Sequence, residues 1–247
     1  MSAAQVISRP RFEQFQRPPR MNVTGQRILA HLNEVSRLRA KAASDGPLSV
    51  MLASVKGFQH ARFAATYADL LATPRYSRAA RFFLDELYGP HDFSKRDAQF
   101  ARVVPALVRL FPSDIVQTVA DLAELHALSE SLDMAMAQQL PQGDVAWPGY
   151  ALAWQAVSQP DERELQIALM LKIGDALDRF TRRPLLRHSL RLMRTPAAAA
   201  GLGALQAFLE SGFDTFSEMR GAQEFLATVA ERERALAAGL FAGSFKA

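Results

Sequence analysis

The sequence predicts an all-α protein, built as a single compact bundle of about ten helices. Apolar residues recur at spacings of three and four in nearly every segment, which is the pattern of amphipathic helices. Strand signals are scarce, because alternating Val, Ile and Thr are almost absent and no Asn-Gly or Asp-Gly pair stands between strand-like runs. Ala, Leu, Arg, Glu and Gln, which favour helices, dominate the chain.

Breaks rich in Pro, Gly, Ser and Asp separate the helices of the first half. The segment 44–47 ends the first helix, and the Thr-Pro pair at 73–74 supplies a cap and a proline for the third. The Gly-Pro pair at 89–90 ends the third helix, since proline cannot continue it. Ser94 and Asp97 form a capping-box pattern for the fourth. These signals delimit helices at residues 23–42, 49–71, 74–88, 94–110 and 114–139.

Proline also begins the next four helices, at Pro148, Pro160, Pro184 and Pro196. Gly212 ends the fourth of these, because glycine readily takes the left-handed conformation that closes a helix. The second half therefore holds helices at residues 148–157, 160–181, 184–194, 195–211 and 214–241.

The chain is long enough to bury a large core, with 247 residues of which 49% are hydrophobic. The segment 141–144 is the one candidate boundary, and it is too short for a linker, so we expect residues 21–247 to form one domain. Residues 1–20 contain three prolines and little periodicity. We expect them to form an extended basic N-terminal arm.

Several classes of protein are excluded by what the sequence lacks. There is no cysteine, which rules out a disulfide framework, a thiolate metal cluster and a cysteine nucleophile. No apolar run is long enough for a membrane span, and no secretory signal begins the chain, so we expect a bacterial-type cytoplasmic protein. No G-x-S-x-G, P-loop or H-E-x-x-H motif supports nucleophilic, phosphoryl-transfer or zinc-protease chemistry.

Basic charge is concentrated in two segments of an otherwise acidic chain. The protein has 24 Arg and 5 Lys, and its formal net charge is +4. Residues 1–41 hold eight basic and two acidic side chains, whereas residues 179–194 hold six Arg and no acid. The second segment thus carries a local charge that needs compensation.

Four of those arginines occupy a narrow arc of one predicted helix, with leucines on the opposite side. Acids of neighbouring helices, or a phosphate, a nucleic acid or an acidic partner protein, would offset their mutual repulsion. No zinc-finger or RNA-binding signature supports a specific nucleic-acid partner. We call this set the arginine stripe: Arg183, Arg187, Arg191 and Arg194.

The sharpest candidate for chemistry lies on the predicted helix 114–139. His126, Glu130 and Asp133 are spaced i, i+4 and i+7, and therefore share one face at the edge of the core. They could bind a metal, one carboxylate could orient the imidazole as a general base, or they could form a local hydrogen-bonded group. The Glu-x-x-His pattern of helical di-iron proteins is absent, so we predict no metal and no cofactor.

A second group of polar residues surrounds the turn near residue 90. Asp85 and Glu86 precede the turn and His91 lies within it. The backbone N–H groups at the start of the next helix could hold an anion there. A simple corner between two helices explains the same residues, and we favour this interpretation.

The block FFLDELYGPHDFSKRD at residues 82–97 resembles a family of uncharacterised bacterial helical proteins with an FFLxxLYGPxDFxxRD-like block. The resemblance extends to the segments 124–133 and 193–213 and covers most of residues 55–235, leaving out the N-terminal arm. It implies an all-helical cytoplasmic protein without an assigned reaction. No catalytic residue is carried over from it.

Three functions follow as expectations. The first is a non-catalytic binding or adaptor protein that contacts an acidic protein or an anionic ligand through its basic surfaces. The second is a helical-bundle enzyme or cofactor binder of the haem-oxygenase-like kind, in which Asp85, Glu86, His126, Glu130 and Asp133 converge on an interhelical pocket. The third is a homodimer whose interface is the last helix, unless its apolar residues pack inward. Those residues are Phe216, Phe225, Leu226, Val229 and Leu236.

Overall fold

The computed structural model describes residues 21–87 and 93–244, and it confirms the predicted all-α class. Within these ranges there are twelve α-helices, one π-helical turn and no strand. The predicted arm at residues 1–20 and His91 lie outside the described residues. Among the helices that are described, none combines the length and the apolar character that crossing a membrane requires.

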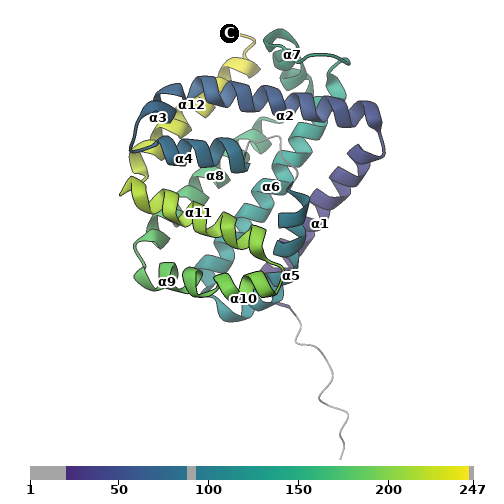
Figure 1. Ribbon diagram of the computed structural model, residues 1–247. Helices are drawn as coiled ribbons and strands as arrows, with labels where there is room; N and C mark the ends of the chain where they lie inside the picture. Colours follow the sequence, from purple (N-terminus) through teal and green to yellow (C-terminus); the bar gives the residue numbers. More distant parts are fainter. Residues whose placement is uncertain (1–20, 88–92, 245–247) are drawn as a thin grey trace, which may run out of the picture.

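The helices pack around α6, the longest of them, which runs through the middle of the molecule (Figure 1). It packs against α1, α2, α5, α7 and α8, and α12 covers α7 and α8. The elements are α1 (Val23–Ala43), α2 (Gly46–Thr66), α3 (Ala68–Ala72), α4 (Ser77–Phe82), the π-helical turn η1 (Phe83–Leu87), α5 (Ser94–Leu110), α6 (Ser113–Gln139), α7 (Trp147–Val157), α8 (Pro160–Thr181), α9 (Pro184–Leu192), α10 (Arg194–Ala199), α11 (Gly203–Met219) and α12 (Gln223–Phe241).

Local chemistry explains where the first helices begin. The side chain of Asn22 accepts a hydrogen bond of 2.8 Å from the backbone N–H of Gly25, which caps α1. Asp45 does the same for Leu48 at 3.1 Å, and a proline stands in the first turn of α2. A break therefore separates the two helices as predicted, but it covers only residues 44–45, since α2 already begins at Gly46.

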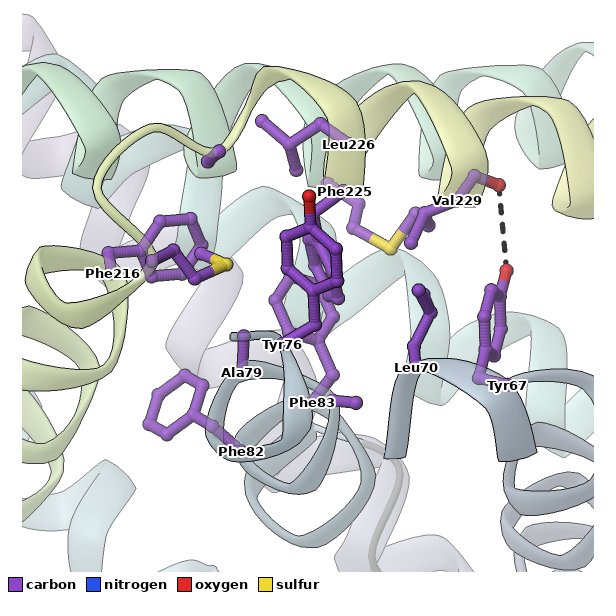
Figure 2. Packing of buried hydrophobic residues seen from close by; sticks show 14 of the residues in the cluster. Tyr67, Leu70, Tyr76, Ala79, Phe82, Phe83, Phe216, Phe225, Leu226 and Val229 are labelled. Atoms are coloured by element: carbon purple, nitrogen blue, oxygen red, sulfur yellow. Dashed lines mark hydrogen bonds between the residues drawn. The ribbon is translucent and has the colours of Figure 1, made fainter. Parts of the chain in front are cut away.

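Three apolar clusters form the core. The largest joins the end of α2 and the helices α3 and α4 to α8, α11 and α12, and Figure 2 shows its aromatic rings between the two halves of the chain. In this cluster the hydroxyl oxygen of Tyr67 lies 3.5 Å from the carbonyl oxygen of Val229 (Figure 2). Phe216, Phe225, Leu226 and Val229 pack inward here, which is the second of the two arrangements expected for them.

The other two clusters lie against opposite halves of α6. One contains Met136, Tyr150 and Trp154, and joins the C-terminal half of α6 to α1, α2, α7 and α12. The other contains Leu32 and Val104, and joins α1 and α5 to the N-terminal half of α6. The space where the three clusters meet is not filled with apolar side chains.

Several predicted helix boundaries are wrong. The predicted helix 49–71 divides into α2 and α3, and the predicted helix 195–211 divides into α10 and the first part of α11. Gly212 does not end a helix, because α11 continues to Met219 and the break falls at Arg220 and Gly221, whose φ angles are +53° and +117°. Gly212 instead allows a close approach, since a Cβ atom there would lie 3.2 Å from the ring of Phe82. The predicted helix 74–88 begins only at Ser77 and changes to a π-helical turn at Phe83.

Candidate functional site

A cavity of about 190 Å³ lies inside the bundle, where the three apolar clusters meet. Side chains of α2, α5, α6, α7, α8, α11 and α12 form most of its wall, and Leu32 of α1 and Glu86 of η1 contribute one each. Most of the wall thus comes from helices far apart in the sequence. The site is therefore formed by the packing of the bundle and not by a single sequence motif.

The wall changes character along α6. Its lining residues from Val119 to Leu125 are apolar, whereas those from His126 to Asp133 are all polar. Neighbouring helices follow the same order, since Asp97 of α5 lies beside His126 and Gln166 of α8 lies beside Ser129. The cavity therefore has an apolar end and a polar end.

His126 is held by residues of two other helices. Its Nε2 lies 2.9 Å from Oδ2 of Asp97, and Arg39 of α1 donates to the same oxygen at 2.8 Å. Burial raises the pKa of Asp97, but His126, Arg39 and Arg96 outweigh this effect and lower the pKa below its ordinary value. Asp97 is thus an ionised carboxylate that fixes the imidazole in the wall.

Glu130 is a buried carboxylate with two cationic partners. Lys56 of α2 donates to its Oε2 at 2.8 Å, and Nη2 of Arg39 donates to its Oε1 at 2.9 Å. Burial raises the pKa of Glu130, yet the two cations outweigh it and lower the pKa below its ordinary value. Arg39 therefore links Glu130 to Asp97 and joins α1, α5 and α6.

Asp133, one turn further along α6, is in a different state. It accepts a hydrogen bond of 2.9 Å from Nε2 of Gln59, which also donates to the hydroxyl of Tyr150 at 3.4 Å. Burial raises the pKa of Asp133 above its ordinary value, and the attraction of Lys56 and Arg163 does not offset this. The pKa values of Glu130 and Asp133, which lie on one face of α6, are thus shifted in opposite directions.

Trp154 and Arg163 complete the polar end. The guanidinium carbon of Arg163 lies 3.9 Å from the ring centre of Trp154, and Arg163 donates to Gln166 at 3.3 Å. Trp154 is only 8% exposed, and its Nε1 has no hydrogen-bond partner among the described residues. A buried N–H group without an acceptor is rare in folded proteins and calls for an explanation.

The structure brings four of the predicted site residues together and leaves others apart. His126, Glu130, Asp133 and Glu86 all line the cavity. Glu86 accepts a hydrogen bond of 3.0 Å from Arg96. Asp85 is exposed outside the cavity, and its Oδ1 lies 4.0 Å from Nε2 of His60.

The three α6 side chains do not share a common centre, because each binds partners of its own. In the described part of the chain, no three His, Asp or Glu side chains are placed to hold one metal ion. The arrangement that the sequence predicted on one helix face is therefore a row of three separate polar contacts. Its chemistry depends on residues from other helices.

The arginine stripe is largely paired within the protein. Arg183 donates to Asp114 at 2.6 Å, Arg187 to Asp214 at 3.0 Å, and Arg194 to Glu210 at 2.6 Å. The stripe faces the body of the protein, whereas Leu185 and Leu192 on the other side of α9 are 80% and 64% exposed. Leu186 and Leu190 of the same helix are half-buried, so α9 exposes only part of its apolar side chains to solvent.

Sequence reasoning missed most partners of the α6 residues. One signal was available on α2, where a basic, an amide and a second basic side chain follow at intervals of three, within a helix whose other face is apolar. No comparable pattern marks the partners from α1, α7, α8 and α12. The missed residues are Arg39, Lys56, Gln59, Arg62, Tyr150, Trp154, Arg163 and Glu233.

Comparison with known families gives one match. The family described as "Domain of unknown function (DUF8198)" matches residues 38–247. No curated protein and no solved structure matches the chain. The match includes every helix that lines the cavity except the first part of α1.

Proposed function

The chain belongs to the DUF8198 family, and we propose that its function is to bind a small molecule in the cavity between its helices. One observation carries this proposal. Polar side chains of α2, α5, α6, α7, α8 and α12 converge on one space of about 190 Å³ whose other end is lined mainly by apolar side chains. Concave sites with a mostly apolar wall and a few placed polar groups are typical of ligand binding.

Stability alone does not account for this polar lining. Burying charged groups costs free energy, and replacing a buried ion pair by apolar residues is often neutral or stabilising. The wall nevertheless includes Lys56, Arg62, Asp97, Glu130 and Glu233. Such groups, with pKa values shifted in opposite directions on one helix, are enriched at functional sites.

The volume of the cavity indicates the size of ligand that fits into it. An apolar cavity of about 150 Å³ can hold benzene. The space here, at about 190 Å³, therefore accommodates a molecule at least as large as one aromatic ring. Its two ends favour a ligand that has both an apolar and a polar part.

Thermal unfolding in the presence of small-molecule mixtures tests the proposal, with native mass spectrometry to identify what binds. A ligand at about a hundred times its Kd adds about 2.7 kcal/mol to the stability, which raises the Tm by several degrees. Leu122→Trp fills the apolar end of the cavity and should abolish the shift. Leu152→Trp places the same side chain on the exposed face of α7 and should retain it.

The proposal fails if no compound stabilises the protein, or if Leu122→Trp and Leu152→Trp respond alike to every compound that does. Circular dichroism of both variants without ligand shows whether the helices are intact. A loss of binding then reports on the cavity and not on the fold.

A reaction on the bound molecule is the second candidate, and one contact favours it. His126 lines the cavity with its Nε2 2.9 Å from Asp97, an arrangement that orients an imidazole for proton transfer. Once a ligand is known, mass spectrometry after incubation shows whether it is altered. His126→Gln should then keep the binding and slow the conversion, whereas an unaltered ligand leaves binding as the function.

A contact role for the arginine stripe has less support. Acids of α6 and α11 already neutralise Arg183, Arg187 and Arg194. An acidic partner protein would have to compete with these intramolecular ion pairs. Salt-dependent pull-down of acidic proteins by the wild type, but not by a variant with Arg187→Ala and Arg191→Ala, would support that role.

A further inference from the structure

The polar end of the cavity offers hydrogen-bond donors next to a positive charge. Nε1 of Trp154 has no partner among the described residues, although the side chain is more than nine-tenths buried in the cavity wall. The hydroxyl of Tyr150 is also buried there and accepts from Gln59, so its own hydrogen is available for an acceptor. The two rings are neighbours, with centroids 6.0 Å apart.

Arg163 supplies the charge at this point. Its guanidinium stacks on the ring of Trp154 at 3.9 Å. A guanidinium remains charged whatever it is hydrogen-bonded to, so it attracts negative charge to the edge of this ring in a buried, weakly screened environment. Two donors beside a cation favour an acceptor that carries negative charge.

The nearby acids do not reverse this preference. Glu130 and Glu233 are each bound to a cation of their own, Lys56 and Arg62. Of the other acids in the described cavity wall, Asp97 is bound to His126 and Arg39, and Glu86 is bound to Arg96. Burial raises the pKa of Asp133, which favours its neutral form. A neutral carboxyl group can itself donate to an anion.

The lining of the cavity follows α6 over several turns. Its lining residues on α6 run from Val119 to Asp133, which corresponds to about 20 Å along the helix axis. A volume of about 190 Å³ along this length leaves room for a slender molecule. The walls at the far end include Phe100, Leu122, Leu205 and Phe208, and the guanidinium carbon of Arg96, which binds Glu86, lies 4.4 Å from the ring centre of Phe208.

We propose that the ligand is an amphipathic organic acid, whose carboxylate accepts hydrogen bonds from Trp154 and Tyr150 beside Arg163 and whose unbranched apolar chain extends along α6 past Leu122. This inference rests on the proposed function and specifies the chemical class of the ligand. A charged amine would be repelled by Arg163, and it has no acceptor for the hydrogen bonds of Trp154 and Tyr150. An alcohol would lose the attraction of the charge.

Calorimetric titration with three probes of equal chain length tests the head group: octanoate, octylamine and 1-octanol. We expect octanoate to bind at least about tenfold more tightly than the other two, since a hydrogen bond to a charged group is worth at least that factor. Trp154→Phe removes the N–H and keeps the ring, and it should weaken octanoate about tenfold. Trp147→Phe is the matched control outside the cavity wall and should bind as the wild type does.

The protein has two tryptophans, so Trp147→Phe leaves Trp154 as the sole indole reporter. Its fluorescence should change on addition of octanoate, and Leu122→Trp should abolish calorimetric binding because it obstructs the path of the chain. Octanoate that binds Trp154→Phe and Leu122→Trp as tightly as the wild type occupies another site and overturns the inference.

Two further outcomes separate this inference from the proposed function. If octylamine or 1-octanol binds as tightly as octanoate and is excluded by Leu122→Trp, the head group is wrong and the cavity still binds a ligand. If none of the three probes binds, the inference is overturned. The proposed function is then tested separately by the thermal-shift comparison of Leu122→Trp and Leu152→Trp.

Discussion

Arg62 of α2 and Glu233 of α12 form a buried ion pair, in which Nη1 and Oε1 are 2.5 Å apart. The hydroxyl of Tyr67 donates to the same carboxylate oxygen at 2.8 Å. Because 171 positions separate the two charged residues, this contact joins the first third of the chain to its last helix across the polar end of the cavity.

Removal of one partner of this pair should destabilise the protein strongly. Glu233→Ala leaves a buried guanidinium without its carboxylate, and we expect a loss of about 3 kcal/mol or more in the free energy of unfolding. Urea unfolding followed by circular dichroism measures it. Arg234→Ala, the neighbouring position on α12, breaks an exposed ion pair with Glu164 of α8 and should cost less than about 1 kcal/mol. Equal losses in both variants would contradict the prediction.

Asp133 should make the protein less stable as the pH rises. Burial raises its pKa in the folded state above 3.8, so between the unfolded and the folded pKa the folded state binds more protons, and stability falls with increasing pH. Asp133→Asn mimics the neutral carboxyl and removes this dependence. We expect the variant to gain stability relative to the wild type at pH 7 and to lose that advantage below pH 3.8.

Glu130 should show the opposite dependence. Lys56 and Arg39 overcome the effect of burial and hold its folded pKa below 4.5, so its stabilising contribution is present above pH 4.5 and is lost as the pH falls through the folded value. Glu130→Gln leaves two cations without a carboxylate and should cost about 3 kcal/mol at pH 7. Urea unfolding at several pH values should show the deficit narrowing in acid; a deficit independent of pH would argue against this assignment.

Two glycines within helices should respond in opposite ways to alanine. Gly174→Ala in α8 places a Cβ atom 2.6 Å from Cδ2 of Leu226 in the core, and we expect a loss of about 1–2 kcal/mol from overpacking. Gly57→Ala in α2 meets no atom within 4 Å. It should stabilise the protein by up to about 1 kcal/mol, because alanine favours the helix. Thermal unfolding of both variants compares the signs directly.

The fold class was readable from the sequence because helix periodicity and capping are local properties. Pro160 and Pro184 begin helices as expected, since proline fits the first turn without losing a hydrogen bond. Gly212 misled the prediction because glycine serves two purposes. Glycine can end a helix, or it can allow a neighbouring side chain to pack closely against the helix. At Gly212 the contact with Phe82 shows that the second applies.

The sequence predicted only part of the candidate site. Periodicity placed His126, Glu130 and Asp133 on one face, and the structure puts that face in the cavity wall. It could not supply Arg39 or Arg163, because their positions depend on how α1 and α8 pack against α6 and not on local spacing. The capping box predicted for Ser94 and Asp97 is wrong, because Phe93 is the N-cap residue of α5 and Asp97 instead binds His126 and Arg39.

The attachment of α9 has a consequence for its dynamics. No residue of this helix is buried, and half-exposed arginines within it or directly beside it form ion pairs with α6 and α11. Such contacts weaken as ionic strength rises, whereas apolar burial does not. Backbone amides of α9 should therefore exchange with deuterium faster in concentrated salt while those of α6 keep their protection, which makes this helix a segment that can detach without unfolding the rest.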